Sequence, residues 1–550
     1  MTTTTMGASS SSLDYDHDDD SVANQKSHHQ QHPTLPDIRS YDTHYINGAW
    51  MESVSDPPTE DAEVGEVVTP TLEVVDANTG AVVATVPKGT ERDTTKAIAA
   101  AKAALPSWKA LPLAQRITYI KSFLQKFEGH REEMVNRTIV ELGCTKTFAN
   151  EKQINAMVGH TLTLLSLLEA KEEKAPAEFE FAYAAGTCTV VKEPVGVVGC
   201  ITPWNYPLHQ IALKVIPALL AGCTVVLKPS EVTPLVVYSI TEAFHEAQLP
   251  PGVFNMIMGE GPACGEILAR HPDVHLVSFT GSTGAGQLLT KVAADSGTMK
   301  PIKTELGGKS ATLLLDDADY ETVVPLFVKQ LMRNTGQSCN GLSRMIVPAA
   351  DYDKVVQLAA KTMQEEIVGD SRLNPEATIG PLISQAQYDR VIGLIKTGID
   401  EGATVVCGGI EKPTGLDDSL ANGYFVQPTL FSHVTNDMTI AQTEIFGPVL
   451  CLIKYETLSE GINIANDTPY GLNNAVASRD TKKALQVAAQ LQSGMVMINK
   501  PDMDLKAPFG GYKQSGNARE WGVSGLEEFL HTKTVNMEVE EYRTLIHGEE

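Results

Sequence analysis

The sequence predicts an α/β protein with parallel sheets and more than one domain. The chain has 550 residues, of which 42% are hydrophobic, so it can bury a sizeable core in two large or three smaller domains. Between residues 194 and 258, apolar runs alternate with helix-like segments in the order βαβαβ. Strands buried on both faces have this composition, and short crossovers through helices require a parallel sheet. The alternation returns after residue 307 and predicts a second α/β domain.

Composition and charge argue against several classes of protein. The chain has 68 acidic and 43 basic residues and a net charge of −25, which disfavours binding to nucleic acid and to anionic membranes. No apolar run approaches the roughly 20 residues that a membrane span needs. We therefore expect neither a nucleic-acid partner nor a membrane partner.

The cysteines indicate a reducing compartment. All eight are scattered without a CxxC pair or a tight cluster, so we expect neither a zinc site nor a disulfide framework. Residues 1–38 contain one Lys and no Arg and lack a signal-peptide core, which argues against a secretory signal and a mitochondrial presequence. The expectation is a cytoplasmic protein without a metal.

The N-terminal region begins with a segment that is too polar to form a core. Residues 1–42 are rich in Thr, Ser, His and Asp, and they predict a disordered tail. A weak metal site at His28, His29 and His32 is the less favoured alternative. A Pro-rich and acidic insertion follows at 53–70.

Strand and helix patterns follow this insertion. The string LEVVDANTGAVVATV predicts a hairpin with its turn at Asn78 to Gly80. Helical periodicity then extends from residue 91 to 169, with breaks expected near Pro106, Pro112 and Gly143.

The βαβαβ unit starts after a predicted hairpin at 179–191. Its strands are PVGVVGCI, CTVVLKP and GVFNMIM, and its helices are predicted at 207–221 and 234–247. In such sheets, ligands bind at the carboxyl ends of the strands. Here these ends carry ITPWNYP and KPSE. Lys228 and Glu231 lie in the second of these motifs, where an acid can accept hydrogen bonds from a ribose diol and repel a 2′-phosphate, which favours NAD over NADP.

A glycine-rich turn follows the next predicted strand, HLVSFTG. The residues GSTGAG at 281–286 lead into a helix-like segment, and free amides at such a transition can hold a phosphate. The spacing is GxxGxG instead of the dinucleotide fingerprint GxGxxG, so a plain structural turn stays an alternative.

Three side chains point to covalent catalysis followed by base-assisted hydrolysis. Cys339 lies in NTGQSCNG, where polar and flexible neighbours would let the thiol ionise, although an ordinary core cysteine is the alternative. Glu305 precedes two glycines and is either a movable base or an exposed acid at a strand end. Asn205 could donate to an oxyanion or could cap the helix that starts at Pro207.

Eight motifs together resemble one family. ITPWNYP, LKPSE, FTGSTGAG, ELGGKS, GQSCN, EIFGPV, NDTPYGL and PFGGYKQSG occur in the order and approximate spacing of the NAD(P)-dependent aldehyde dehydrogenase superfamily, over residues 44 to 536. The resemblance implies an aldehyde dehydrogenase-like α/β fold, with a Rossmann-type parallel-sheet cofactor domain, a second α/β catalytic domain and a small β oligomerisation element.

The same resemblance implies domain boundaries. They are a disordered tail at 1–42, an NAD-binding domain at 43–177 and 195–306, a catalytic domain at 307–515, an oligomerisation element at 178–194 and 516–540, and a C-terminal tail at 541–550. A homodimer or homotetramer is expected.

The roles of individual residues are implied in the same way. Cys339 would be the nucleophile, Glu305 the general base, and Asn205 with the Cys339 backbone N–H the oxyanion hole. NAD is the implied cofactor, with NADP less favoured. Its binding residues would be Ile201, Thr202, Trp204, Lys228, Ser230, Glu231, Gly281, Ser282, Gly286, Leu306, Glu444 and Phe446.

The implied activity is oxidation of an aldehyde to a carboxylic acid through a cysteine thiohemiacetal and a thioester. A catalytically idle, crystallin-like scaffold and a CoA-acylating enzyme are the alternatives, and the presence of Glu305 speaks against the second. Tyr206, Gln210 and Leu213 offer few π faces for a quaternary ammonium group, so we expect an aliphatic or aromatic aldehyde of modest polarity. Ala518 and Trp521 depart from the family pattern.

Overall fold

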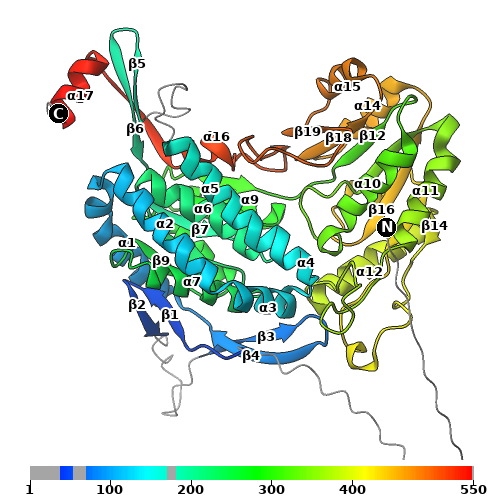
Figure 1. Cartoon of the computed structure of the whole chain (residues 1–550), viewed down its shortest axis with the longest axis horizontal. Helices are drawn as coiled ribbons and strands as arrows, with labels where there is room; N and C mark the ends of the chain where they lie inside the picture. Colours follow the sequence, from blue (N-terminus) through cyan, green and yellow to red (C-terminus); the bar gives the residue numbers. More distant parts are fainter. Residues whose placement is uncertain (1–37, 54–69, 170–180, 548–550) are drawn as a thin grey trace, which may run out of the picture. The chain divides into compact units, whose positions relative to one another are not determined.

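The computed structural model describes residues 38–53, 70–169 and 181–547, all of them within one compact unit (Figure 1). The predicted acidic and histidine-rich parts of the tail and most of the insertion at 53–70 lie outside the described residues. The boundary of the tail at residue 42 is wrong, because residues 38–42 pack on the fold. The Tyr41 backbone N–H donates to the Thr85 carbonyl at 2.9 Å, and the Tyr41 ring stacks on Tyr238 at 3.8 Å.

The first sheet has seven strands in the order β11-β10-β7-β8-β9-β1-β2. Its parallel strands are β7 Val197–Ile201, β8 Thr224–Lys228, β9 Phe254–Met256, β10 Leu276–Thr280 and β11 Ile302–Glu305. The hairpin β1 Thr43–Ile46 and β2 Ala49–Glu52 adds to one edge in antiparallel orientation. The crossovers contain α6 Pro207–Ala221, α7 Leu235–Glu246, η2 Gly261–Gly265, α8 Glu266–Arg270 and α9 Thr283–Asp295. The predicted βαβαβ unit is confirmed.

Helices from the N-terminal third pack beside this sheet (Figure 1). They are α1 Glu91–Ala110, α2 Leu113–Gly129, α3 Arg131–Leu142, α4 Lys146–Phe148, η1 Ala149–Asn155 and α5 Ala156–Glu169. The predicted breaks at Pro112 and Gly143 are confirmed, and Gly143 ends α3 with φ 73°. The predicted break at Pro106 is wrong, since α1 continues through it. Its buried face extends past the proline to Trp108, whose indole donates to the Leu219 carbonyl at 3.1 Å.

The hairpin that precedes these helices has strands β3 Thr71–Asp76 and β4 Ala81–Pro87, with the turn where the sequence predicts it.

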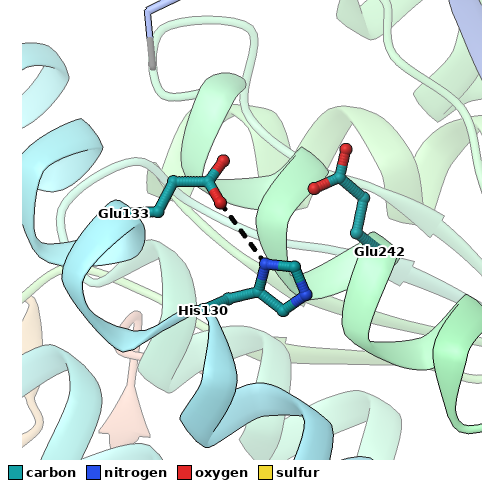
Figure 2. A group of neighbouring side chains, drawn as sticks. All are labelled: His130, Glu133 and Glu242. Carbon is teal, nitrogen blue, oxygen red and sulfur yellow. Dashed lines mark hydrogen bonds and ion pairs between the residues drawn. The ribbon is translucent and has the colours of Figure 1, made fainter. Parts of the chain in front are cut away.

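Where α2 meets α3, the His130 ring lies between Glu133 of α3 and Glu242 of α7 (Figure 2).

The second sheet also has seven strands, in the order β14-β15-β16-β13-β12-β18-β19. They are β12 Ala311–Leu314, β13 Arg344–Pro348, β14 Thr404–Cys407, β15 Thr429–Ser432, β16 Val449–Tyr455, β18 Asn473–Ala477 and β19 Met495–Ile498. β14 runs antiparallel to β15, and the other neighbouring strands are parallel. The predicted second α/β region is therefore present.

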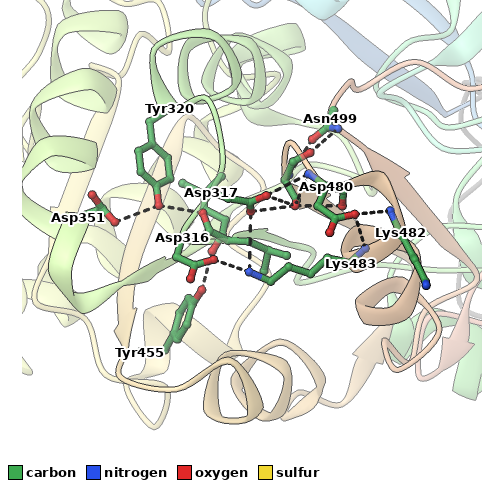
Figure 3. Close-up of polar contacts among 12 residues, drawn as sticks. Asp316, Asp317, Tyr320, Asp351, Tyr455, Asp480, Lys482, Lys483 and Asn499 are labelled. Atoms are coloured by element: carbon green, nitrogen blue, oxygen red, sulfur yellow. Dashed lines mark hydrogen bonds and ion pairs between the residues drawn. The ribbon is translucent and has the colours of Figure 1, made fainter.

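The helices of this region are α10 Tyr320–Met332, α11 Tyr352–Gln364, α12 Gln385–Asp400, α13 Thr439–Gln442, α14 Leu458–Asn466 and α15 Thr481–Ala488, with the short turns η3 Arg333–Gly336, η4 Ala349–Asp351 and η5 Asp418–Leu420. Polar contacts join the loops that follow β12 and β18 (Figure 3). Asp317 accepts from the Ser478 hydroxyl at 2.8 Å and from the Asp480 backbone N–H at 3.0 Å, and Lys483 pairs with Asp316 at 2.5 Å. This network fixes two neighbouring strand ends.

A small third sheet joins distant parts of the chain. β6 Cys188–Pro194 lies between β5 Ala182–Ala185 and β21 Leu530–Val535. The C-terminal stretch also contains β20 Tyr512–Lys513, which pairs with β17 Tyr470–Gly471, and the helices α16 Gly522–Glu527 and α17 Val539–His547. The predicted tail at 541–550 is wrong for 541–547, because α17 forms there and Arg543 donates to the Ala182 carbonyl at 3.1 Å. The other domain boundaries stay predictions.

None of the helices within the described ranges combines the length and the apolar character that crossing a membrane requires.

Candidate active site

The predicted catalytic residues come from three separate segments and face one cavity of about 430 Å³. Asn205 follows β7, Glu305 ends β11, and Cys339 follows the turn after α10. The predicted site residues that line this cavity are Trp204, Asn205, Gly281, Ser282, Glu305, Leu306, Cys339, Glu444 and Phe446. Lining residues that the sequence did not single out include Thr283, Gln387, Arg390 and Tyr470.

The loop that carries Cys339 is held firmly, in contrast to the flexibility predicted from its composition. Asn334 and Thr335 adopt left-handed conformations with φ 52° and 56°. The Asn334 amide donates to the Asn205 carbonyl at 3.0 Å, and the Thr335 hydroxyl donates to the Gly380 carbonyl at 3.0 Å. A Cβ at Gly336 would lie 2.1 Å from the Gly447 carbonyl oxygen, so this turn needs glycine.

Asn205 is a buried hydrogen-bond donor at the cavity wall. Its Nδ2 donates to the Gln337 carbonyl at 3.0 Å, which leaves the second N–H of the amide for another acceptor. The alternative of a helix cap is wrong, because no side chain caps α6 and its first flanking residue is Tyr206.

Glu305 is fully buried, so the alternative of an exposed acid is wrong. Burial raises the pKa of Glu305 well above its ordinary value, and the charges of Glu520 and Glu444 add to this rise while Lys214 opposes it. Neither carboxylate oxygen forms a hydrogen bond of good geometry within the described residues, and the nearby Cys339 thiol lessens the rise in the pKa of Glu305. A carboxyl group in this environment accepts a proton at neutral pH more readily than an exposed one.

The C-terminal segment closes the surroundings of Glu305. Gly516 forms an antiparallel bridge with Glu305, and the Leu306 backbone N–H donates to the Ser515 carbonyl at 2.9 Å. The side chain of Asn517 accepts from the Thr304 backbone N–H at 2.8 Å. Glu305, the last residue of β11, is thus held in place by a segment more than 200 residues later in the chain.

The Cys339 thiol is harder to ionise than the sequence predicts. Burial raises the pKa of Cys339 well above its ordinary value, and Glu305, Glu444 and Glu520 raise it further, while the Asn340 backbone N–H opposes them. The polar residues near Cys339 in the sequence do not dominate its environment in the fold. The thiol therefore needs a base, or an added positive charge, to become a nucleophile.

A buried ion pair that the sequence analysis missed lies behind these groups. Lys214 of α6 and Glu520 are both buried, and their side chains approach to 2.5 Å. Lys214 is the one charged residue in the apolar helix PLHQIALKVIPALLA, and a charge at such a position needs a buried partner. The position of Lys214 among apolar residues was the feature of the sequence that could have predicted this ion pair.

The glycine-rich turn forms a bare backbone surface on the cavity wall. Ser282 caps α9, and its hydroxyl accepts from the Ala285 backbone N–H at 3.2 Å. A Cβ on Gly286 would approach Leu306 to 2.8 Å, and one on Gly307 would lie 2.2 Å from a Glu444 oxygen. Backbone N–H groups at the start of a 13-residue helix can hold a pyrophosphate. The residues present therefore fit a dinucleotide.

The remaining predicted cofactor residues lie outside this cavity, at the carboxyl ends of β7 and β8 or on α9. The Lys228 ammonium pairs with Glu231 at 2.8 Å, and 41% of the Glu231 side chain is exposed. The Thr202 backbone N–H donates to the Lys228 carbonyl at 3.2 Å, which joins the two strand ends. The residues concerned are Ile201, Thr202, Lys228, Ser230, Glu231 and Gly286.

A second cavity of about 220 Å³ also reaches Cys339 and is lined by aromatic and imidazole rings. The Trp521 ring stacks on Phe509 at 4.9 Å and contacts His160 at 4.6 Å. Burial lowers the pKa of His160 to about 4 and that of His209 well below its ordinary value, so both rings are neutral at pH 7.

Two residues named for the substrate, Tyr206 and Gln210, line this second cavity, whereas Leu213 lines a separate space of about 20 Å³. Trp521 has φ 68° and ψ 153°, a backbone conformation that costs a residue other than glycine about 1–3 kcal/mol. The sequence SGNAREWG showed that Trp521 departs from the family pattern, but it did not indicate that this side chain lines the second cavity.

One side-chain group within the described residues has the spacing of a metal site. His130, Glu133 and Glu242 each offer a ligand atom within 4.8 Å of the others (Figure 2). Glu133 already pairs with Arg137 at 2.5 Å and Glu242 with Arg39 at 2.8 Å. Because these arginines neutralise both carboxylates, we assign no metal here.

Comparisons with known proteins agree with this arrangement. The model of the aldehyde dehydrogenase family matches residues 66–535. The chain is 45% identical to 3-succinoylsemialdehyde-pyridine dehydrogenase of a Pseudomonas species, over 90% of this chain and 99% of that protein.

Solved structures give the same result. A mutant of aldehyde dehydrogenase C from Pseudomonas syringae, in complex with NAD⁺ and octanal, has a TM-score of 0.84 and 40% identity over 92% of this chain and 98% of that one. An aldehyde dehydrogenase from Mycobacterium tuberculosis, in complex with NAD⁺, has a TM-score of 0.82 and 36% identity over 91% of this chain and 99% of that one.

Proposed function

Because this chain belongs to the aldehyde dehydrogenase family, we propose that it oxidises an aldehyde to the corresponding carboxylic acid and reduces NAD. One observation carries the proposal: Cys339, Glu305 and Asn205 meet in a single cavity. A thiol, a buried base and an amide donor are the groups that covalent oxidation of an aldehyde needs.

The first step is attack by the Cys339 sulfur on the aldehyde carbon. The thiol gives its proton to solvent, a C–S bond forms as the C=O π bond opens, and the carbonyl oxygen becomes the oxyanion of a thiohemiacetal. The free N–H of the Asn205 amide and the backbone N–H of Cys339 stabilise this oxyanion. NAD, when bound, accepts the hydride that converts the thiohemiacetal into a thioester.

Glu305 acts in the second half of the reaction. Its raised pKa suits a base that takes a proton from water near neutral pH, so that the water attacks the thioester and releases the acid. This requirement for a base distinguishes hydrolysis from transfer to CoA. The retention of Cys339, Glu305, Asn205 and Glu444 also argues against an idle scaffold.

The cofactor would extend from the cavity to the ends of β7 and β8. Lys228 and Glu231 would hold the adenosine ribose, Ser282 and the turn at 281–286 the pyrophosphate, and Glu444 the nicotinamide ribose. The relatives that were solved with NAD⁺ support this assignment. The partly exposed carboxylate of Glu231 disfavours a 2′-phosphate and hence NADP.

We further propose a homodimer or homotetramer built on the sheet β21-β6-β5. A cytoplasmic location suits the mechanism, since Cys339 must stay a free thiol and a reducing compartment keeps it so.

The experiment that tests the proposal follows reduction of NAD and NADP by the purified protein in the presence of hexanal or benzaldehyde. We expect oxidation of at least one aldehyde, a preference for NAD and no dependence on CoA. A folded protein that oxidises neither aldehyde contradicts a substrate of modest polarity, and one that oxidises no aldehyde of any class contradicts the function. A product that forms only with CoA favours the acylating alternative.

A further inference from the structure

Two cations line the second cavity and have no part in the proposed chemistry. Arg333, at the end of α10, and Lys152, in η1, both lie on its wall together with Cys339. Neither side chain forms an ion pair or a side-chain hydrogen bond with any of the described residues. Arg333 is exposed and Lys152 is half-buried. Two cations without an acidic partner therefore lie on the wall of the cavity that reaches the thiol.

The charges of both cations reach groups inside the cavity. Burial raises the pKa of Tyr206 to about 12, and the charge of Arg333 opposes this rise. Burial also lowers the pKa of His209, and the charge of Lys152 contributes to that decrease. Tyr206 and His209 both line the cavity, so the two positive charges act on the space in front of the thiol.

The same two cations are shared between this cavity and a neighbouring one. The neighbouring cavity, of about 390 Å³, is lined by Arg333 and Lys152 together with Glu151 and Glu376. Within the thiol cavity the one carboxylate is Asp502, and the imidazoles of His160 and His209 are neutral at pH 7. In a chain with a net charge of −25, a substrate cavity with two cations and one anion favours an anionic ligand.

We propose that the substrate is an aldehyde with a carboxylate at its remote end, a proposal that rests on the proposed function. Arg333 and Lys152 bind this carboxylate. The planar guanidinium of Arg333 can form two parallel hydrogen bonds to a carboxylate. The middle of the substrate packs against Tyr206, Phe509 and Trp521, and the aldehyde reaches Cys339. This replaces the expectation of modest polarity with a substrate that is polar at both ends and apolar between them.

The test compares 4-formylbenzoate with its methyl ester, which differ in one negative charge. For the unaltered enzyme we expect kcat/KM to be about 10-fold higher for the acid, which corresponds to about 1.4 kcal/mol. Arg333→Gln should lower the acid-to-ester ratio about 3-fold, and the double variant Arg333→Gln/Lys152→Gln should bring it to about 1. Arg333→Lys should restore part of the ratio, and Asp502→Asn should raise it. Added NaCl should lower the rate for the acid more than that for the ester.

Lys361→Gln is the matched control, since this exposed cation lies on α11 and away from the cavity. It should leave the acid-to-ester ratio unchanged. Equal kcat/KM for acid and ester in the unaltered enzyme, with no response to the Arg333 and Lys152 variants, overturns this inference while the proposed function stands. If neither compound nor any neutral aldehyde is oxidised, the proposed function itself fails.

Discussion

The two cavities that meet at Cys339 are built in different ways. The larger one, of about 430 Å³, is walled by glycine backbone and carboxylates, including Gly281, Glu305 and Glu444. The smaller one, of about 220 Å³, is walled by rings and two cations, including Trp521 and Arg333. Gln210 and Cys339 belong to both. In the proposed function, the cofactor thus contacts mainly backbone and carboxylates, whereas the substrate contacts mainly rings and cations.

The balance of charge also differs between the two sides, with a consequence for the thiol: acidic residues outnumber basic ones in the larger cavity and the reverse holds in the smaller one. Carboxylates on the cofactor side raise the pKa of Cys339, and the cations lie toward the substrate side. The thiol therefore stays protonated until positive charge or a base reaches it. Substitutions in the smaller cavity should change the KM for the aldehyde, and substitutions in the larger cavity should change the KM for NAD or the turnover.

The largest effect is expected where the two cavities join. Cys339→Ala should lower turnover about 10⁴-fold or more, because the covalent intermediate cannot form. Binding of NAD, measured by calorimetry, should persist, since the cofactor side is intact. Cys407→Ala, a half-buried thiol on β14, is the control and should keep its activity. Full steady-state activity in the Cys339 variant would refute covalent catalysis.

The next effect separates the two halves of the reaction. Glu305→Gln should lower steady-state turnover about 10²- to 10⁴-fold, because water is no longer deprotonated. Rapid mixing should still detect a burst of reduced cofactor close to one per active site. Glu132→Gln, an exposed acid on α3, serves as the control. A variant without a burst would place Glu305 in the oxidation step as well.

The charge asymmetry predicts the direction of the pH profile. In the proposed mechanism Cys339 and Glu305 act in their deprotonated forms, and both have pKa values raised well above the ordinary range. Lowering the pH protonates them, so kcat/KM should fall by up to about 10-fold per unit as pH decreases from 9 to 6. Thermal unfolding at each pH checks that the fold persists. A rate that increases toward low pH would contradict these directions.

A smaller effect is expected from the substrate side alone. Trp521→Ala should raise KM for benzaldehyde about 10-fold, since it removes a ring that stacks on Phe509 in the cavity. KM for NAD should stay within about 2-fold. Equal changes in both constants would show that the two cavities are not independent.

The smallest effect concerns the choice of cofactor. Glu231→Gln should raise the ratio of kcat/KM for NADP over NAD about 5-fold, because it removes a charge that repels the 2′-phosphate. The effect is modest since 41% of the Glu231 side chain is exposed and solvent screens its charge. Glu260→Gln, with 44% exposure and a lysine partner of its own, is the control. An unchanged ratio would remove Glu231 from cofactor selection.

The sequence predicted the cofactor side better than the substrate side, for a physical reason. Gly281, Ser282 and Glu444 lie in short motifs because a backbone surface needs particular residues in consecutive positions. Lys152, Arg333 and Trp521 come from three separate segments, and no local pattern indicates that their side chains converge.

The sequence also could not predict the surroundings of a side chain where residues distant in the chain create them. The neighbours of Cys339 in the chain are polar, which suggested an ionisable thiol, but Glu444 and Glu520 approach only in the fold. Pro106 is a similar case, because a helix break was expected from a local rule and packing around Trp108 overrides it.

The bridge between Glu305 and Gly516 has a consequence for the order in which a new chain becomes active. A ribosome completes the strands β7 to β11 long before it reaches residue 515, so the first sheet can assemble while synthesis continues. The carboxyl group at the end of β11 then faces an unfinished wall. Ser515, Gly516 and Asn517 can close it only once they have themselves been synthesised. A nascent chain thus carries Cys339 and Glu305 well before the wall around Glu305 is complete.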